Sequence, residues 1–346
     1  MIHIFRLISL IPCLFFFLPQ ILHSLDFPKD HSFHKGYKLE WCYFIGNLET
    51  TDKIKIGYEL SFFKAEIQGK EEIFPVHFAI SETNQKKHIT VDALNRTIGS
   101  LGKYTEKMIS SGDYKIEILS PLELQIIARP RNSEISLNLA LKISNPNEIL
   151  LQGPNGYSQK SRKYPDIFST YYSIPRLKTD GFIKNGDKKY EIVNGLSWMD
   201  HEWSSPSSQK NEKIGSQNTE WDWVCLNLDD GTDIMAFNFR NTKQDLSESF
   251  GTIRTKNGEV RYFSKPEEVI FTPLSENWKS KKTGKSYKLN WNLKIGEYDL
   301  ILKPNFEDQE FNAIQSTGNT YWEGGITATG KINGRDSSGN GYLELK

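Results

Sequence analysis

The segment at residues 198–203 reads Trp-Met-Asp-His-Glu-Trp and places one imidazole close to two carboxylic acids and two indole rings. The strand-like residues before it predict an extended segment, in which alternate side chains share a face. His201 and Trp203 would then point to one side and Asp200 to the other. An imidazole beside large aromatic surface suits acid–base chemistry in an apolar pocket. The alternative is a core strand that carries one hydrogen-bonded histidine beside solvated acids.

Carboxylic acids also occur within two other tryptophan-containing segments, Glu40-Trp41 and Glu220-Trp221-Asp222. Burial in an apolar pocket raises the pKa of a carboxyl group, so that it can donate a proton near neutral pH. Asp222 is therefore a candidate acid. The alternative is that these acids form ion pairs with nearby arginines.

His31 and His34 form a His-x-x-His pair ahead of Glu40. Two histidines at this spacing can bind a metal, but no third ligand follows at a defined distance. We therefore predict no metal and interpret the pair as a polar rim or as a surface loop. The sequence also lacks a phosphate loop, a Gly-x-Ser-x-Gly elbow and a His-Glu-x-x-His motif, so no cofactor is predicted.

Alternation of apolar and polar residues predicts strands with one dry and one wet face along most of the chain after residue 25. Examples lie at residues 54–62, 135–143 and 289–295. Asn-Gly and Asp-Gly pairs between such segments are typical of hairpin turns. No long amphipathic helix is evident. These patterns predict an all-β protein with antiparallel sheets.

Residues 40–48 and 220–228 share the pattern Glu-Trp-x-aromatic-x-x-x-Asn-Leu. Each copy is followed by turn residues and an alternating strand, which favours two copies of one β unit. A unit of this length is typical of a small barrel that holds a ligand. Chance similarity in an aromatic-rich sequence is the alternative.

The composition excludes some partners. The 346 residues include 43 Lys and Arg and 43 Asp and Glu, so the net charge is zero and nucleic acid is not a predicted partner. Aromatic residues make up 12% of the chain and favour a large aromatic interior.

Residues 1–24 contain an apolar run that follows Arg6 and is interrupted by prolines. This pattern predicts a secretory signal peptide better than a membrane span. Lipid attachment at Cys13 is the alternative. Cys42 and Cys225 would remain in the mature chain, and we predict two buried thiols instead of a disulfide scaffold.

Several segments combine aromatic, acidic, histidine and glycine residues at distinctive spacings, and they lie at residues 27–34, 40–44, 153–158, 171–177, 198–203, 220–223, 321–324 and 341–345. In this order they resemble the AttH/carotenoid 1,2-hydratase family over nearly the whole mature chain. The resemblance implies two tandem lipocalin-like barrels, in agreement with the internal repeat. It also implies addition of water to the terminal double bond of an acyclic carotenoid, without a cofactor.

Carried onto this chain, the resemblance implies catalytic roles for His201 and Trp203, with Asp222 as the acid. Asp200 and Glu202 would orient these groups. The aromatic residues that we predict to bind the ligand are Trp221, Trp41, Tyr43, Tyr172 and Trp198. Two departures from the family pattern, Cys42 and Val224 in place of aromatic residues, indicate a wider pocket or a different ligand.

We therefore predict a signal peptide at residues 1–24 and two lipocalin-like barrels at residues 25–204 and 205–346, which meet near residues 200–203. The predicted protein is an exported monomer, with membrane association left open. It binds a hydrophobic small molecule of isoprenoid or lipid type, and hydratase or isomerase chemistry is the predicted reaction. The alternatives are a carrier without catalysis and a scaffold protein of the cell envelope.

Overall fold

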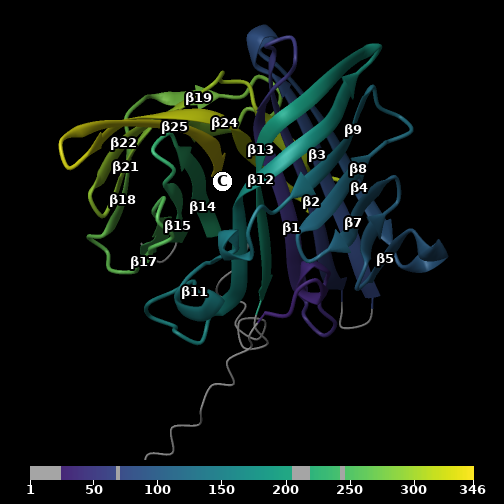
Figure 1. The fold of residues 1–346 in the computed structure, drawn as a ribbon, viewed down its shortest axis with the longest axis horizontal. Coiled ribbons are helices and arrows are strands. Elements are labelled where there is room, and N and C mark those ends of the chain that lie inside the picture. Colours follow the sequence, from purple (N-terminus) through teal and green to yellow (C-terminus); the bar gives the residue numbers. More distant parts are fainter. Residues whose placement is uncertain (1–24, 68–70, 205–218, 242–245) are drawn as a thin grey trace, which may run out of the picture.

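The computed structural model describes residues 25–67, 71–204, 219–241 and 246–346, and within these residues it contains strands and short 3-10 turns but no α-helix (Figure 1). The predicted all-β class is confirmed. No helix in this part of the chain is long and apolar enough to cross a membrane. The 3-10 turns are η1 (Lys29–His31), η2 (Thr83–Gln85), η3 (Ile98–Ser100), η4 (Pro146–Glu148) and η5 (Pro154–Gly156).

The first sheet is antiparallel and has the strand order β4-β3-β2-β1-β13-β12-β9-β8-β7-β6-β5, with β10 and β11 paired to β12. It curves around one core into a nearly closed barrel, the first barrel (Figure 1). Its strands are β1 (Leu39–Glu49), β2 (Lys55–Ile67), β3 (Glu71–Glu82), β4 (Lys87–Arg96), β5 (Gly102–Thr105), β6 (Met108–Ser111), β7 (Tyr114–Ser120), β8 (Glu123–Ala128), β9 (Ile135–Lys142), β10 (Leu150–Leu151), β11 (Tyr157–Gln159), β12 (Phe168–Asn185) and β13 (Lys188–Ser204).

The second sheet has the order β17-β16-β15-β14-β25-β24-β22-β21-β18, with β23 paired to β24, and it encloses a core of its own, the second barrel. A separate hairpin joins β19 to β20. These strands are β14 (Thr219–Leu228), β15 (Asp233–Asn241), β16 (Leu246–Arg254), β17 (Val260–Phe263), β18 (Val269–Pro273), β19 (Asn277–Lys279), β20 (Ser286–Lys288), β21 (Trp291–Ile295), β22 (Tyr298–Pro304), β23 (Glu310–Ala313), β24 (Asn319–Ile332) and β25 (Arg335–Leu345).

The two segments of the internal repeat occupy equivalent places. β1 pairs with β2 and with β13, and β14 pairs with β15 and with β25, so each lies between the second and the last long strand of its sheet. Cys42 on β1 and Cys225 on β14 are both buried free thiols, as predicted. The predicted signal peptide with Cys13 lies outside the described residues, and so do residues 205–218 at the predicted boundary.

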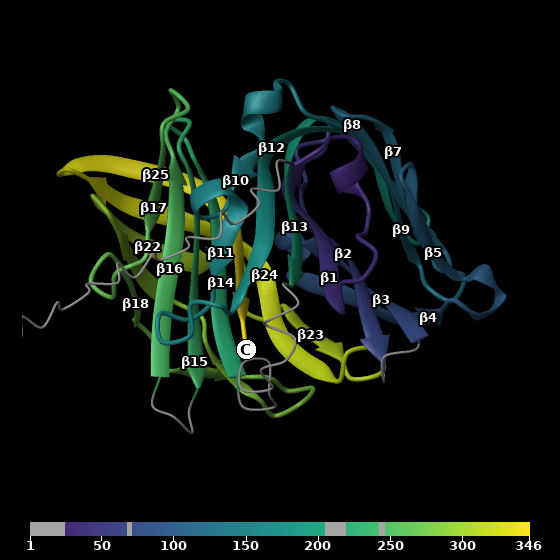
Figure 2. The same cartoon turned by 90° about the horizontal axis from the view of Figure 1, so that it is seen from below.

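Strand β1 is buried on both faces, because a second layer covers the outside of the first barrel (Figure 2). Cys42 and Phe44 point into the core of the first barrel, while Tyr43 and Ile45 point outward. The outward residues belong to an aromatic layer between the two barrels, which we call the seam. Its buried members are Tyr43, Ile45, Tyr171, Trp198, Trp223, Cys225, Met235, Phe237, Phe250 and Tyr342.

Candidate active site

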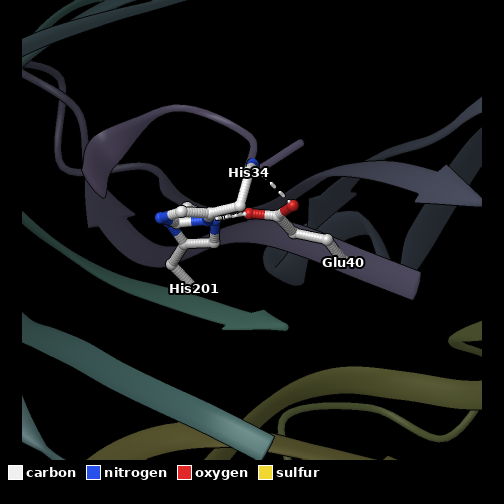
Figure 3. A group of neighbouring side chains, drawn as sticks. All are labelled: His34, Glu40 and His201. Atoms are coloured by element: carbon white, nitrogen blue, oxygen red, sulfur yellow. Dashed lines mark hydrogen bonds and ion pairs between the residues drawn. The ribbon is translucent and has the colours of Figure 1, made fainter. Parts of the chain in front are cut away.

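Two histidines and a glutamate meet inside the first barrel (Figure 3). Glu40 lies on β1 and His201 on the adjacent strand β13, while His34 comes from the segment before β1. Nδ1 of His34 and Nε2 of His201 lie 2.6 and 2.8 Å from the same oxygen, Oε1 of Glu40. Because a carboxylate only accepts hydrogen bonds, each imidazole directs an N–H group at this atom.

Lys64 on β2 completes the surroundings of Glu40. Its Nζ lies 3.0 Å from Oε2 of Glu40, and the backbone N–H of His34 donates to the same oxygen over 2.8 Å. Burial alone would raise the pKa of Glu40, but the hydrogen bonds from His201 and His34 outweigh it and lower the pKa to about 2. Glu40 is therefore ionised at neutral pH, although it lies in the barrel interior.

A chain of hydrogen bonds continues from His201 to His31. Nδ1 of His201 lies 3.2 Å from the Tyr172 hydroxyl, which lies 2.9 Å from Nδ1 of His31. Nε2 of His31 donates to the carbonyl oxygen of Pro121 over 3.0 Å. In the neutral state both Nδ1 atoms then carry lone pairs. The single phenol proton of Tyr172 can reach only one of three acceptors at a time, because this hydroxyl also donates to the carbonyl oxygen of Asp30 over 3.1 Å.

The pKa values of the two imidazoles that contact Glu40 are shifted in opposite directions. Burial opposes the charged form of His34, but its bonds to Asp30 and Glu40 prevail and raise its pKa to about 9. Burial lowers the pKa of His201, and the nearby charge of His34 acts in the same direction, although Glu40 partly offsets both. At neutral pH His34 is thus an imidazolium and His201 a neutral imidazole, the combination of an acid and a base.

Aromatic rings enclose this pair. The ring of His34 stacks on Trp203 at a centroid distance of 4.0 Å. Phe33 and Tyr172 present edges to His201 at centroid distances of 6.3 and 5.4 Å. His201, Tyr172 and Glu40 are fully buried. The predicted proximity of His201, Trp203 and Tyr172 is therefore observed. We call the buried interior of the first barrel around these side chains the chamber.

The ligand atoms of His34, Glu40 and His201 lie within 4.8 Å of one another and could in principle hold a divalent ion. The ammonium group of Lys64 at Glu40 opposes this, because it already neutralises the one carboxylate of the set. Both imidazole nitrogens that face Glu40 also carry the protons of its hydrogen bonds. The donor set fits a protonated network better than a metal.

Asp200 and Trp198 lie on the opposite face of β13, as the strand alternation predicts, and so do not contact His201. The indole Nε1–H of Trp198 donates to Asp200 over 2.6 Å, and the hydroxyls of Tyr171 and Ser173 donate to the same carboxyl group. Burial raises the pKa of Asp200 to about 7. Asp200 therefore belongs to the seam and not to the His201 chamber.

Asp222 and Trp221 belong to the second barrel. Asp222 forms an ion pair with Arg240 and accepts a hydrogen bond from Asn238, both on the neighbouring strand β15. The indole of Trp221 donates to Glu344 over 2.9 Å. The expected grouping of Asp222 with His201 in one cavity is not found, because the two side chains point into different barrels. Asp222 instead forms an ion pair with an arginine, which was the alternative considered from the sequence.

Trp41 and Tyr43 also lie away from the chamber. Tyr43 donates a hydrogen bond to Glu323 of the second barrel, and Trp41 packs against the seam. Alternation along β1 explains this, because Glu40 and Cys42 point inward while the residues between them point outward. Their predicted role at the same ligand as His201 has no geometric support.

Sequence reasoning missed four members of the site: His31, His34, Glu40 as a partner of histidine, and Lys64. The His-x-x-His pair was interpreted as a rim or a loop, whereas His31 is fully buried. The signal that could have found them is the run His31-x-x-His34 followed closely by Glu40 on a strand with a tryptophan. The pairing of β1 with β13, on which the site depends, has no local signature.

A pocket of about 300 Å³ lies at the seam, outside this chamber. Trp198, Tyr342 and Cys225 line its apolar side, and Arg176 and Asn227 its polar side. The guanidinium of Arg176 is bound to Asp233, and the Asn227 amide donates to Asp233 and to a backbone carbonyl. Because these polar side chains already bind other protein groups, they are less available for catalysis than the imidazoles of the His34–His201 cluster.

Two antiparallel barrels in tandem, one of which holds a buried histidine–carboxylate cluster, define a lipocalin-like protein with an internal duplication. The AttH-like family model matches residues 19–346, and the chain belongs to the AttH-like family. The resemblance identified in the sequence is confirmed.

Solved structures agree with this assignment. A candidate AttH protein (NE1406) from Nitrosomonas europaea is 28% identical, with a TM-score of 0.82 over 93% of this chain and 97% of that one. Kievitone hydratase from Nectria haematococca is 17% identical, with a TM-score of 0.73 over 94% of both chains, and shares the fold.

A relative with a named activity matches part of the chain. The dehydratase asqC of Emericella nidulans is 25% identical over 187 residues, which are 51% of this chain and 50% of that protein. The match therefore spans about half the length of this relative.

Proposed function

We propose that this protein catalyses the addition or removal of water on an apolar small molecule, without a cofactor, in the chamber of the first barrel. The observation that carries the proposal is the binding of His34 and His201 to one oxygen of Glu40 while their pKa values are pushed apart. The names of the relatives, a hydratase and a dehydratase, support the same reaction class.

The hydrogen bonds define which nitrogens would meet the substrate. Glu40 holds the inner nitrogens at 2.6 and 2.8 Å. The outer nitrogens have longer bonds of 3.2 Å, from Nδ1 of His201 to Tyr172 and from Nε2 of His34 to Asp30. A substrate replaces the longer bonds more easily. Nδ1 of neutral His201 is then the base, and Nε2–H of the His34 imidazolium is the acid.

In the dehydration direction, Nδ1 of His201 removes a proton from carbon and Nε2 of His34 protonates the leaving hydroxyl group. A carbon–carbon double bond forms and one water molecule leaves. His201 is then protonated and His34 neutral. The nitrogens that face Oε1 of Glu40 keep their protons throughout. The starting state is restored when a water molecule takes the proton from Nδ1 of His201 and Nε2 of His34 regains one from water. Hydration follows the same steps in reverse.

The proposed substrate is an isoprenoid or lipid-like molecule, because the chamber is lined by aromatic rings and lies next to the apolar core of the first barrel. Export of the protein remains part of the proposal and rests on the apolar run within residues 1–24. A competing proposal is a carrier without catalysis. The complete burial of His201, Tyr172 and Glu40 favours it, since these residues could be a structural tie.

The test has two stages. Mass spectrometry of organic extracts from natively purified protein identifies bound apolar molecules. The protein is then incubated with these molecules, and with an acyclic carotenoid, in water enriched in oxygen-18. Hydration is expected to add one labelled oxygen per product molecule. The variants His34→Gln and His201→Ala are expected to lose the label while retaining the bound molecule.

If the wild-type protein adds labelled oxygen to none of the molecules tested, catalysis is rejected and the carrier proposal is supported. His88→Gln is the matched control, because His88 is another histidine of the first sheet, bonded to Ser81 and without contact to the cluster. This variant is expected to retain full labelling.

A further inference from the structure

A pair of glutamates joins the two barrels on the far side of β1 from the active-site cluster. Glu59 lies on β2 of the first barrel and Glu323 on β24 of the second. Tyr321 of β24 donates to Glu59, and Tyr43 of β1 donates to Glu323, so the two carboxyl groups face each other between the same strands. Oε2 of Glu59 is buried without any other hydrogen-bond partner, and the electrostatics of each carboxyl group include a hydrogen bond to the other. The side chains are buried, with relative exposures of 3% and 2%, so water cannot screen them.

Every other donor to this pair is a neutral group. Tyr321 and Ser61 donate to Oε1 of Glu59 over 3.1 and 2.9 Å, and Tyr43 donates to Oε1 of Glu323. His77 lies 2.6 Å from the Tyr321 hydroxyl, which is already donating, so the imidazole supplies the proton of that bond. Burial lowers the pKa of His77 to about 3, so it is uncharged at neutral pH.

No lysine, arginine or histidine forms an ion pair with Glu59 or Glu323 within residues 25–67, 71–204, 219–241 and 246–346. The titratable groups that face the pair from the surrounding strands are Tyr43, His77, Cys225, Tyr321, Tyr342 and Glu344. None of these supplies a positive charge. Two ionised carboxylates in contact would also repel each other strongly at low local dielectric.

Two carboxyl groups can hydrogen-bond to each other when one of them carries a proton. We propose that Glu59 and Glu323 share one proton across the seam and that this proton fastens the second barrel to the first. We call the pair the carboxyl joint. Loss of the proton leaves two adjacent negative charges, one on each barrel, and pushes β2 and β24 apart. The joint is independent of the proposed hydratase reaction, because it lies outside the chamber.

The sign of the pH effect follows from burial. Burial raises the pKa of Glu59 from 4.5 to about 8 and that of Glu323 in the same direction. The folded protein therefore binds more protons than the unfolded chain between these pH values. The stabilisation from the joint is complete below about pH 4.5 and is lost as the pH rises through about 8.

The experiment uses full-length wild type and the variants Glu59→Gln and Glu323→Gln. An amide replaces the protonated carboxyl group in shape and donates to the remaining carboxylate, but it does not titrate. Infrared spectra of the wild type at pH 7 are expected to show a band from protonated carboxyl groups. In each glutamine variant this band should be weaker by the intensity of one carboxyl group. Glu49→Gln, at an exposed glutamate of β1, is the control and should leave the band unchanged.

Hydrogen exchange gives a second readout that does not depend on the band. Protection of β24 in the wild type is expected to fall between pH 6 and pH 9, after correction for intrinsic rates, while β8 away from the seam keeps its protection. Glu59→Gln should abolish this fall. A wild-type band that neither variant diminishes, or equal protection of β24 at both pH values, would overturn the proposal. Asp200 and Glu344 also have pKa values of about 7 near the seam, so the comparison with a variant is needed. If one glutamine variant fails to fold, the other variant decides.

Discussion

The ammonium group of Lys64 lies 3.0 Å from the carboxylate of Glu40, and neither side chain has any exposure to solvent. A buried lysine is unusual and must be paired, because an isolated charge in the protein interior is strongly unfavourable. Here the pair closes the Glu40 side of the site. Lys64 thereby places an ammonium group beside the carboxylate that the two imidazoles also bind.

Replacing Lys64 by methionine is expected to lower the free energy of unfolding by about 1–3 kcal/mol, because the buried Glu40 carboxylate and the His34 carbonyl oxygen lose the donor that Lys64 supplies, while the His34 imidazolium remains. Urea unfolding at pH 7 measures the change. Lys53→Met is the control, since Lys53 pairs with Glu49 on the surface at 81% and 48% exposure. Solvent screens that surface pair, so its loss should change the free energy of unfolding little. Equal losses in the two variants would contradict the assignment of Lys64 to a buried pair.

The proposed acid–base roles predict a bell-shaped dependence of the rate on pH. His201 must be neutral, and its pKa lies below 6.5, so activity falls on the acid side below that value. His34 must be charged, and its pKa is about 9, so activity falls again as the pH rises through about 9. Initial rates from pH 4 to pH 10 test this. A profile that rises steadily up to pH 10 would exclude His34 as the acid.

Stability should respond to the same group. The pKa of His34 is raised from 6.5 in the unfolded chain to about 9 in the folded protein. Its contribution to folding is therefore complete below about pH 6.5 and disappears as the pH rises through about 9. His34→Gln should show a smaller loss of melting temperature than the wild type across this range. An unchanged slope would show that His34 is not charged in the folded state.

Removing either imidazole should reduce the rate of turnover by about 10²–10⁴-fold, which is the usual contribution of a positioned acid or base. His201→Ala and His34→Gln are to be compared with wild type in single-turnover experiments. Because the ligand contacts the aromatic walls, binding should change much less than the rate. A variant that loses binding and turnover together would favour a structural role.

Asp222→Asn is expected to leave turnover unchanged and to reduce stability by about 1–3 kcal/mol, since Arg240 loses its ion-pair partner in the second barrel. Turnover and thermal unfolding of the same preparation separate the two effects. A large loss of rate at wild-type stability would restore Asp222 as an acid of the reaction.

The strand alternation was readable from the sequence and correctly places His201 and Trp203 on one face of β13 and Asp200 on the other. The duplication was readable as well, because β1 and β14 begin with the same pattern. These inferences depend on neighbours in sequence and on a period of two residues, both of which are local properties.

Which residues meet in the site could not be predicted from such local patterns. Glu40, Lys64 and His201 come from three different strands, and their meeting depends on the registers of β1 with β2 and with β13. The error at Asp222 has the same origin: its partner Arg240 is set by the register of β14 with β15. Local patterns define the inward face of a strand but not which residues of other strands meet there.

Because β1 has no face that is free of protein contacts, the halves of this molecule are not interchangeable modules. A fragment that ends with β13 would expose Tyr43, Ile45 and Trp198 to solvent as one continuous hydrophobic patch. Such a truncated product should aggregate when expressed without its other half.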